Sequence, residues 1–180
     1  MDASTITLRP HRPGDMSWVI HRQATVYAEE FGYNSDFEAL VANVTASFLA
    51  NYNPERERCW IAESDGQHVG HVFLVQHPER ETVAKLRLLL VEASARGTGL
   101  GSMLVNECIT FARHAGYLRI TLWTQSHLLA AHHIYKKMDF RLVNEERHRS
   151  FGRDLIGQTW ELDLDPPRGG HGPSHNSIRD

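Results

Sequence analysis

One glycine-rich stretch, Arg96-Gly97-Thr98-Gly99-Leu100-Gly101, limits what this chain can fold into. It follows an apolar run at 88–91 and precedes an amphipathic run that begins at Leu100, so the pattern predicts a strand, a tight turn and a helix. The first backbone N–H groups of a helix have no intrahelical partner and lie at the positive end of its dipole. Glycines let a ligand approach such a backbone closely, and Arg96 adds a positive charge. We therefore predict a pyrophosphate-binding cradle at this turn.

The spacing of the glycines separates this cradle from two related phosphate-binding motifs. A P-loop ends in Gly-Lys-Ser/Thr, whereas Gly101 is followed by Ser102 and Met103. A dinucleotide-binding G-x-G-x-x-G motif would need a glycine where Leu104 stands, and the next strand, near Thr121, does not end in an acidic residue. The remaining pattern is Arg-x-x-Gly-x-Gly. An ordinary glycine-rich turn is the alternative that these six residues alone leave open.

Composition narrows the class of protein further. The chain has 180 residues, of which 41% are hydrophobic and 23% charged, as is typical of a globular protein with one domain and a sizeable core. The formal net charge of −3 argues against a nucleic-acid-binding module. No apolar run approaches the length of a membrane span, and residues 1–25 lack the apolar core of a signal peptide. We therefore expect a cytoplasmic protein with no nucleic-acid or membrane partner.

The cysteines and histidines do not form a pattern that is typical of a metal site. The two cysteines, Cys59 and Cys108, are too few for a disulfide framework or a cysteine-based metal site, and both fit buried positions. Among the twelve histidines, His132 and His133 are adjacent and would point to different sides of a helix. The sequence shows no three-ligand group, so we predict no bound metal.

The hydrophobic pattern predicts alternating strands and helices. We expect Asp15 to cap the first helix and Ser35 or Asp36 to cap the second. Residues 144–156 are polar and are predicted to form a loop. Residues 165–180 are rich in Gly, His, Pro and Ser and are expected to form a disordered tail. In chain order we predict a strand at 6–10, helices at 15–29 and 35–49, strands at 59–63, 69–75 and 83–91, a helix at 100–115, a strand at 118–123, a helix at 129–138, and strands at 140–143 and 158–164.

Arg96, Gly99 and Gly101 resemble the acyl-coenzyme A signature of GNAT-type N-acetyltransferases. The later stretch 131–140 resembles the closing pattern of that family, A-x-x-L/I-Y-x-x-x-G-F, at Ala131, Ile134, Tyr135 and Phe140. The resemblance implies one α/β (α+β) domain over residues 1–164, with the order β-α-α-β-β-β-α-β-α-β-β. It also implies a mixed sheet of about seven strands in which the fourth and fifth strands splay apart.

Two positions depart from the family pattern. Asp139 replaces the usual glycine, although aspartate tolerates a left-handed backbone. Leu128 stands where the family often has an asparagine that helps hold the cofactor. The runs at 59–63, 84–91 and 157–162 resemble more closely the acetyltransferase half of bacterial fusions with a MarR-type regulator.

The resemblance implies an acetyl-coenzyme A-dependent N-acetyltransferase in which a small-molecule primary amine attacks the thioester directly. It implies that Tyr135 assists the departing thiolate and that a backbone N–H near 89–91 holds the oxyanion. A non-catalytic acyl-coenzyme A or small-molecule sensor that regulates a partner is the alternative, and a homodimer is compatible with either function. The resemblance implies that acetyl-coenzyme A contacts Leu89, Leu90, Val91, Arg96, Gly97, Thr98, Gly99, Leu100, Gly101 and Ser102.

The strand before the cradle carries two cationic residues, Lys85 and Arg87, where the family often has a glutamate. They share a strand face by the period of two, and they either line a solvated, salt-bridged face or capture an acidic group of the acceptor. Glu63, His71 and Glu145 are candidate general bases, and a chain of water molecules would serve equally well.

Overall fold

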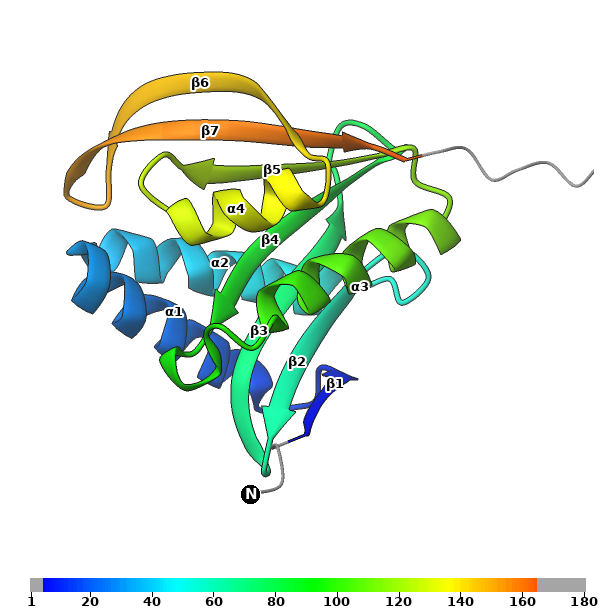
Figure 1. Cartoon of the computed structure of the whole chain (residues 1–180), viewed down its shortest axis with the longest axis horizontal. Coiled ribbons are helices and arrows are strands. Elements are labelled where there is room, and N and C mark those ends of the chain that lie inside the picture. The colour runs from blue at the N-terminus through cyan, green and yellow to red at the C-terminus, as the bar shows by residue number, and fades with distance from the viewer. Residues whose placement is uncertain (1–4, 165–180) are drawn as a thin grey trace, which may run out of the picture.

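A mixed seven-stranded sheet lies between two pairs of helices in the computed structural model, which describes residues 5–164 (Figure 1). The predicted tail at 165–180 lies outside the described residues. Within residues 5–164, no helix has the length and apolarity needed to cross a membrane. The elements are β1 (Ile6–Pro10), α1 (Asp15–Phe31), α2 (Ser35–Asn51), β2 (Arg58–Ser64), β3 (Gln67–Gln76), β4 (Val83–Val91), η1 (Ala93–Ala95), α3 (Leu100–His114), β5 (Arg119–Gln125), α4 (Leu129–Lys137), β6 (Arg141–Ser150) and β7 (Arg153–Asp163).

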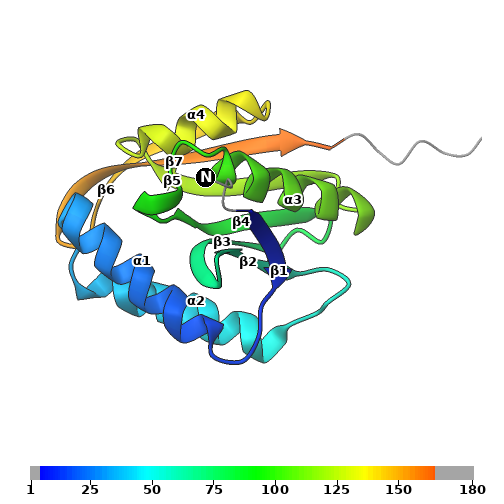
Figure 2. The same ribbon diagram turned by 60° about the horizontal axis from the view of Figure 1, so that its bottom comes forward.

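The strands lie in the order β1-β2-β3-β4-β5-β7-β6, and every neighbouring pair is antiparallel except β4 with β5. Helices α1 and α2 cover one face of the sheet, and α3 and α4 cover the other (Figure 2). Each face has its own buried hydrophobic cluster; Cys59 belongs to the α1–α2 side and Cys108 to the α3–α4 side. The predicted element order and the burial of both cysteines are therefore confirmed.

The structure confirms that the fourth and fifth strands, β4 and β5, separate along part of their length. β4 and β5 pair only from Val83 with Arg119 to Leu86 with Leu122, although both strands continue beyond that point. Leu88 has a left-handed backbone (φ 50°), and the pairing of β4 with β3 shifts register there. Such a bulge bends the strand and turns its end away from a neighbour. The bulge at Leu88 therefore helps to open the gap between the two strands.

The prediction of a loop at 144–156 is wrong. This segment forms most of a long hairpin, in which β6 pairs with β7 around a turn at Phe151 and Gly152. β6 is the edge strand of the sheet, and nearly all of its residues are exposed. A strand that is exposed on both faces needs no alternation of polar and apolar residues, so the hydrophobic pattern could not reveal it.

The helix ends follow the predictions in part. Asp139 has φ 65° directly after α4, as expected where the family has glycine. The predicted caps of the first two helices are wrong. Gly14 precedes α1 without a side-chain cap, and the side chain of Asn34 caps α2 by accepting from the N–H of Asp36.

Asp15 instead ties the start of α1 to the first strands. Its carboxylate accepts hydrogen bonds from the guanidinium of Arg9 at 2.7 Å and from the N–H of Arg12 at 2.6 Å, and Arg9 also pairs with Glu63. Burial acts to raise the pKa of the Asp15 carboxyl, but these donors outweigh burial and lower that pKa below 3.8. The network fixes one end of α1, the helix that forms a wall of the candidate site.

We expect Asp15→Asn to lower the free energy of unfolding at pH 7 by about 1.5–3 kcal/mol, because a charge-assisted hydrogen bond is lost. Asp154→Asn is the control, since its partner Arg149 and Asp154 itself are largely exposed and such a pair contributes little. A carboxyl with a lowered native pKa stabilises fully above its unfolded pKa, and this contribution is lost as the pH falls through the native pKa. Urea denaturation should therefore show the Asp15→Asn deficit shrinking below about pH 4, and a constant deficit would contradict this account.

Candidate active site

The glycine-rich stretch forms the predicted strand–turn–helix, with the short helix η1 inserted between β4 and the turn. Gly97 and Gly99 have φ values of 76° and 87°, and a Cβ atom added to either would meet no atom within 4 Å. Their open side is the feature that a ligand cradle needs, and helix α3 begins directly after Gly99. Thr98 is exposed, and its hydroxyl donates to the carbonyl of Ala95 at 2.7 Å.

The absence of a side chain at Gly101 lets helices α3 and α4 pack closely. A Cβ atom at this position would lie 2.6 Å from the terminal methyl of Ile134 on α4. The second glycine of the cradle and the isoleucine of the 131–140 stretch are therefore in contact, which joins the two halves of the sequence signature.

The guanidinium of Arg96 is not free. It pairs with Glu30, near the end of α1, at 2.6 Å. Both side chains are partly exposed, so the pair contributes little and can exchange for an anionic ligand at small cost. In this structure the positive charge of Arg96 is therefore balanced by the carboxylate of Glu30 on α1.

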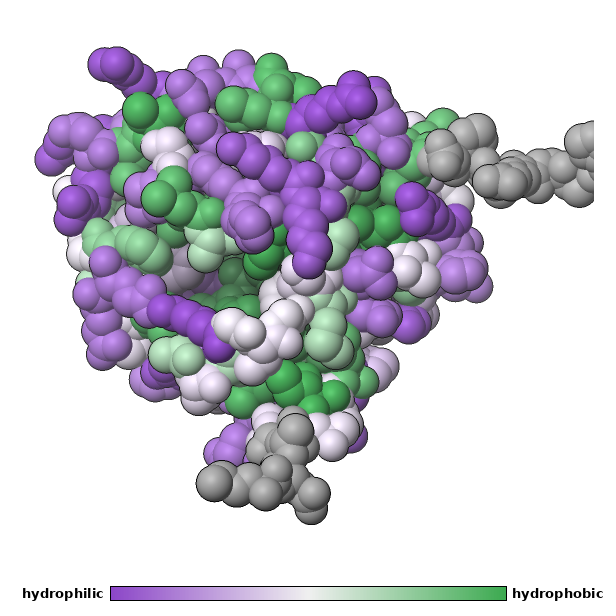
Figure 3. Space-filling model, viewed as in Figure 1, coloured by the Kyte–Doolittle hydropathy of each residue, from purple (hydrophilic) through white to green (hydrophobic). Residues whose placement is uncertain are grey.

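A cavity of about 710 Å³, which we call the cradle groove, runs from the turn along the end of β4 to α4. Nine of the ten residues predicted to contact acetyl-coenzyme A line it, and Thr98 is the exception. Figure 3 shows a hollow with hydrophobic residues at its floor on this face of the molecule. Leu128, which replaces the family asparagine, adds an apolar side chain to the groove wall.

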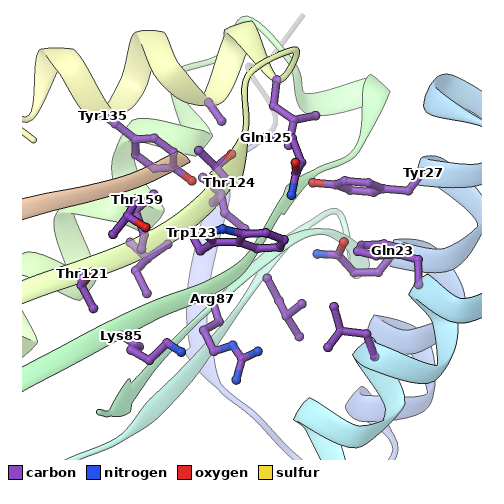
Figure 4. Close-up of a pocket in the computed structure, with 18 of the residues that line it drawn as sticks. Gln23, Tyr27, Lys85, Arg87, Thr121, Trp123, Thr124, Gln125, Tyr135 and Thr159 are labelled. Atoms are coloured by element: carbon purple, nitrogen blue, oxygen red, sulfur yellow. The ribbon is translucent and has the colours of Figure 1, made fainter. Parts of the chain in front are cut away.

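A second cavity of about 420 Å³, which we call the inner pocket, adjoins the cradle groove at the splay. Both cavities are lined by Tyr27, Leu89, Leu128 and Ala131, so they share a wall. Thr121 to Gln125 of β5 line the inner pocket opposite β4 (Figure 4). The splay therefore connects the groove at the glycine-rich turn with a smaller pocket between the two strands.

The charged side chains in the wall of the inner pocket are all cationic. Lys85 and Arg87 line it, together with Arg80, and the wall contains no aspartate or glutamate. Among residues 5–164, neither Lys85 nor Arg87 has an acidic partner within ion-pair distance, whereas Arg80 pairs with Glu161. Burial, followed by the charges of Arg87 and Arg80, lowers the pKa of Lys85, and burial lowers the pKa of Arg87. The positive electrostatic field of these side chains favours the binding of an anionic ligand.

Tyr135 lies where the two cavities meet. It is 4% exposed on α4 and lines the inner pocket, with its hydroxyl directed toward Thr124 in Figure 4. No hydrogen bond ties that hydroxyl to another residue in the described part of the chain. Burial raises the pKa of Tyr135 well above its usual range, so the hydroxyl keeps its proton and remains a donor.

The candidate general bases lie outside both cavities. Glu63 pairs with Arg9, Glu145 accepts from the amide of Gln158 at 2.7 Å, and His71 is fully buried behind the pocket. Burial, followed by the charge of His68, lowers the pKa of His71 to about 3, which makes it a weak base.

Sequence reasoning missed several pocket residues, among them Gln23, Tyr27 and Trp123. Gln23 lies on α1 between buried Val19 and Val26, and a polar residue at such a helical core position is the signal that could have revealed it. Burial, followed by the charge of Glu30, raises the pKa of Tyr27 to about 12, so it is a neutral neighbour of both cavities.

The turn of the β6–β7 hairpin closes the inner pocket near the α1–α2 loop. Phe151 stacks on Tyr33 with ring centroids 5.0 Å apart and contacts the edge of Phe37, and its carbonyl accepts from the N–H of Asn34. These aromatic rings form one wall of the pocket.

A cradle at the start of a helix, a splayed parallel pair of strands and a buried tyrosine at their junction thus lie together in one site. The family model for the "Acetyltransferase (GNAT) family" matches residues 22–140, which is more than half of the chain. The chain belongs to this acetyltransferase family.

Relatives and solved structures agree with this assignment. N-acetylaspartate synthetase of Danio rerio is 34% identical over 105 residues, which cover 58% of this chain and 36% of that protein. Human N-acetyltransferase 8 is 34% identical over 109 residues, covering 58% and 46%. The chain thus spans less than half the length of these two relatives. A Salmonella typhimurium protein solved with its cofactor acetyl-CoA has the same fold, with a TM-score of 0.74 and 18% identity over 89% of this chain and 94% of that one.

We expect Gly99→Asn to weaken acetyl-coenzyme A binding at least tenfold, because its side chain would project into the open side of the cradle. Gly116→Asn is the matched control: Gly116 also has a left-handed backbone with nothing within 4 Å, but it follows the far end of α3. Asparagine tolerates such a backbone, so both variants should fold with similar losses of melting temperature. Equal affinities of the two variants in calorimetry would remove the cradle from the site.

Proposed function

We propose that this acetyltransferase transfers an acetyl group from acetyl-coenzyme A to the primary amine of a small anionic molecule, with an amino dicarboxylic acid as the first candidate. The observation that carries the proposal is the inner pocket, where Lys85 and Arg87 have no acidic partner among residues 5–164 and which meets the cradle groove at the splay. The relatives named N-acetylaspartate synthetase favour the same class of acceptor.

Acetyl-coenzyme A would supply the acetyl group as a thioester. The open glycines of the cradle and the first N–H groups of α3 suit its pyrophosphate. Beyond Leu86, one edge of β4 has no strand partner while the other pairs with β3 through Leu90 and Val91. The peptide groups of 88–91 that face the gap can therefore bind the pantetheine arm, and one of their N–H groups can hold the oxyanion.

Lys85 and Arg87 would bind the carboxylates of the acceptor. A pocket of about 420 Å³ suits a small molecule, and charge-assisted hydrogen bonds to Arg are strong and directional. The same positive field disfavours the ammonium form of the acceptor, because no carboxylate in the wall balances that charge. The pocket thus helps the amine to bind neutral, which is the form that can attack.

Tyr135 would assist the departing thiolate. Its protonated hydroxyl lies at the junction of the two cavities with no competing partner among residues 5–164. A hydrogen bond from this hydroxyl would stabilise the negative charge on sulfur as the thioester breaks.

The second candidate function is a non-catalytic acyl-coenzyme A or small-molecule sensor. The resemblance to the acetyltransferase half of MarR-type fusions motivates it. The free hydroxyl of Tyr135 and the joined cavities favour the enzyme, because a sensor needs no proton donor at that junction. Release of free coenzyme A thiol in the presence of an amine panel separates the two functions.

We expect Arg87→Ala to raise the KM for an anionic amine by about 10- to 100-fold, because a charge-assisted contact is lost. The KM for acetyl-coenzyme A should change little. Arg149→Ala is the control, since Arg149 is an exposed cation outside both cavities. Steady-state assays with aspartate and with uncharged amines give the comparison; a preference for uncharged or cationic amines, or an unchanged KM, argues against the anionic acceptor.

We expect Tyr135→Phe to lower kcat by about 10²- to 10⁴-fold, the usual contribution of a general acid. The affinity for acetyl-coenzyme A should stay within a few-fold. The melting temperature should hardly change, because the ring keeps its packing against Phe140 and Trp160 and no hydrogen bond to a described residue is lost. An unchanged kcat with a lower melting temperature would make Tyr135 a structural residue.

A further inference from the structure

Gln23 is a buried polar side chain in the wall of the inner pocket to which the reaction described above gives no role. It is 1% exposed, and its amide reaches from α1 toward the space bordered by Trp123 and Tyr27 (Figure 4). Its amide oxygen Oε1 is buried and has no hydrogen-bond partner among the described residues. A buried carbonyl that no donor satisfies is costly, so a ligand N–H that reaches it gains a full hydrogen bond.

His71 holds the other end of this amide. The Nε2 atoms of Gln23 and His71 lie 3.2 Å apart. His71 is fully buried on β3 against Trp18 and Phe73, and its pKa of about 3 keeps it neutral. A neutral ring can accept the amide N–H of Gln23 at Nε2 and carry its own proton on Nδ1. In the orientation that the structure gives this amide, Nε2 faces His71 and Oε1 remains for the pocket, while Nδ1 of His71 has no partner among the described residues.

Hydroxyl groups of Thr121, Thr124 and Thr159 also line the pocket and can either donate or accept hydrogen bonds. Its charged wall residues donate hydrogen bonds and cannot accept them. The amide oxygen of Gln125 already lies 3.0 Å from Nε2 of His148. Gln23 therefore supplies an acceptor oxygen that no described residue uses, at the end of a side chain that His71 holds in place.

We propose that Gln23 binds the amino group of the acceptor through its amide oxygen and orients the lone pair of that nitrogen toward the acyl donor, with His71 as the positioning residue. This inference rests on the proposed function, since it requires an amine in the inner pocket. It divides recognition between two sides of the pocket: Lys85 and Arg87 bind the anionic part, and Gln23 binds the nitrogen.

The test compares calorimetric binding of aspartate with that of succinate, which keeps both carboxylates and lacks the amine. Gln23→Met, which keeps the shape without the oxygen, should weaken aspartate binding by about 3- to 12-fold, the equivalent of one hydrogen bond. Succinate binding should change less than twofold. Arg87→Ala should weaken both compounds.

Two further variants control the comparison. Gln23→Glu keeps an acceptor oxygen but adds a negative charge to a pocket that favours anions, so it should weaken succinate binding more than aspartate binding, because only aspartate has an ammonium group that can pair with the new carboxylate. Val19 is buried one turn earlier on α1 and lines neither cavity. Val19→Ala should therefore lower the melting temperature without changing the affinity for aspartate or succinate.

The turnover number kcat separates the two roles, because it should fall if Gln23 orients the amine but not if Gln23 only stabilises the fold. Misplacing the amine should lower kcat of Gln23→Met about tenfold or more, with the KM for acetyl-coenzyme A unchanged. Equal losses for aspartate and succinate, or a Val19→Ala variant that reproduces the Gln23→Met pattern, would overturn the assignment of Gln23 and leave the proposed function standing. A wild-type protein that binds neither compound would contradict the acceptor class and this inference together.

Discussion

The site depends on two parallel strands that stop pairing halfway along their length. After Leu86 and Leu122, the facing edges of β4 and β5 have no sheet hydrogen bonds to each other. Unpaired peptide groups inside a protein are costly unless a ligand or water satisfies them. Each other part of the candidate site lies around this gap: the cradle follows β4, Tyr135 lies on the helix after β5, and both cavities meet between the strands.

The two halves of the family signature are linked by contact. Gly99 is required for its left-handed backbone and open side, whereas Gly101 lies against Ile134 of α4. Ile134 directly precedes Tyr135, so the packing of α3 on α4 also sets where the tyrosine lies. A motif that spans about forty residues of sequence is therefore one local structure.

The parts of the site that follow from backbone geometry could be predicted from the sequence. The cradle was visible because its glycines, the preceding apolar run and the following amphipathic run are contiguous. The pairing of Arg96 with Glu30 was not visible, because it joins residues far apart in sequence. The start of β6 was predicted as a strand at 140–143, but the rest of β6 was missed because an exposed edge strand has no hydrophobic period. Gln23 was missed because one polar residue on a buried helix face leaves the helical period intact. Lys85 and Arg87 were found, but only the structure shows that they face a pocket without acidic side chains.

The turn at Phe151 lies beyond residues 22–140, the part that the family model matches, while the cradle and Tyr135 lie within it. The wall that Phe151 completes touches the inner pocket but not the cradle groove. Substitutions or length changes in this hairpin turn can thus resize the inner pocket without disturbing the cradle groove. One part of the inner wall can in this way diverge during evolution while the stretch that forms the glycine-rich turn is retained.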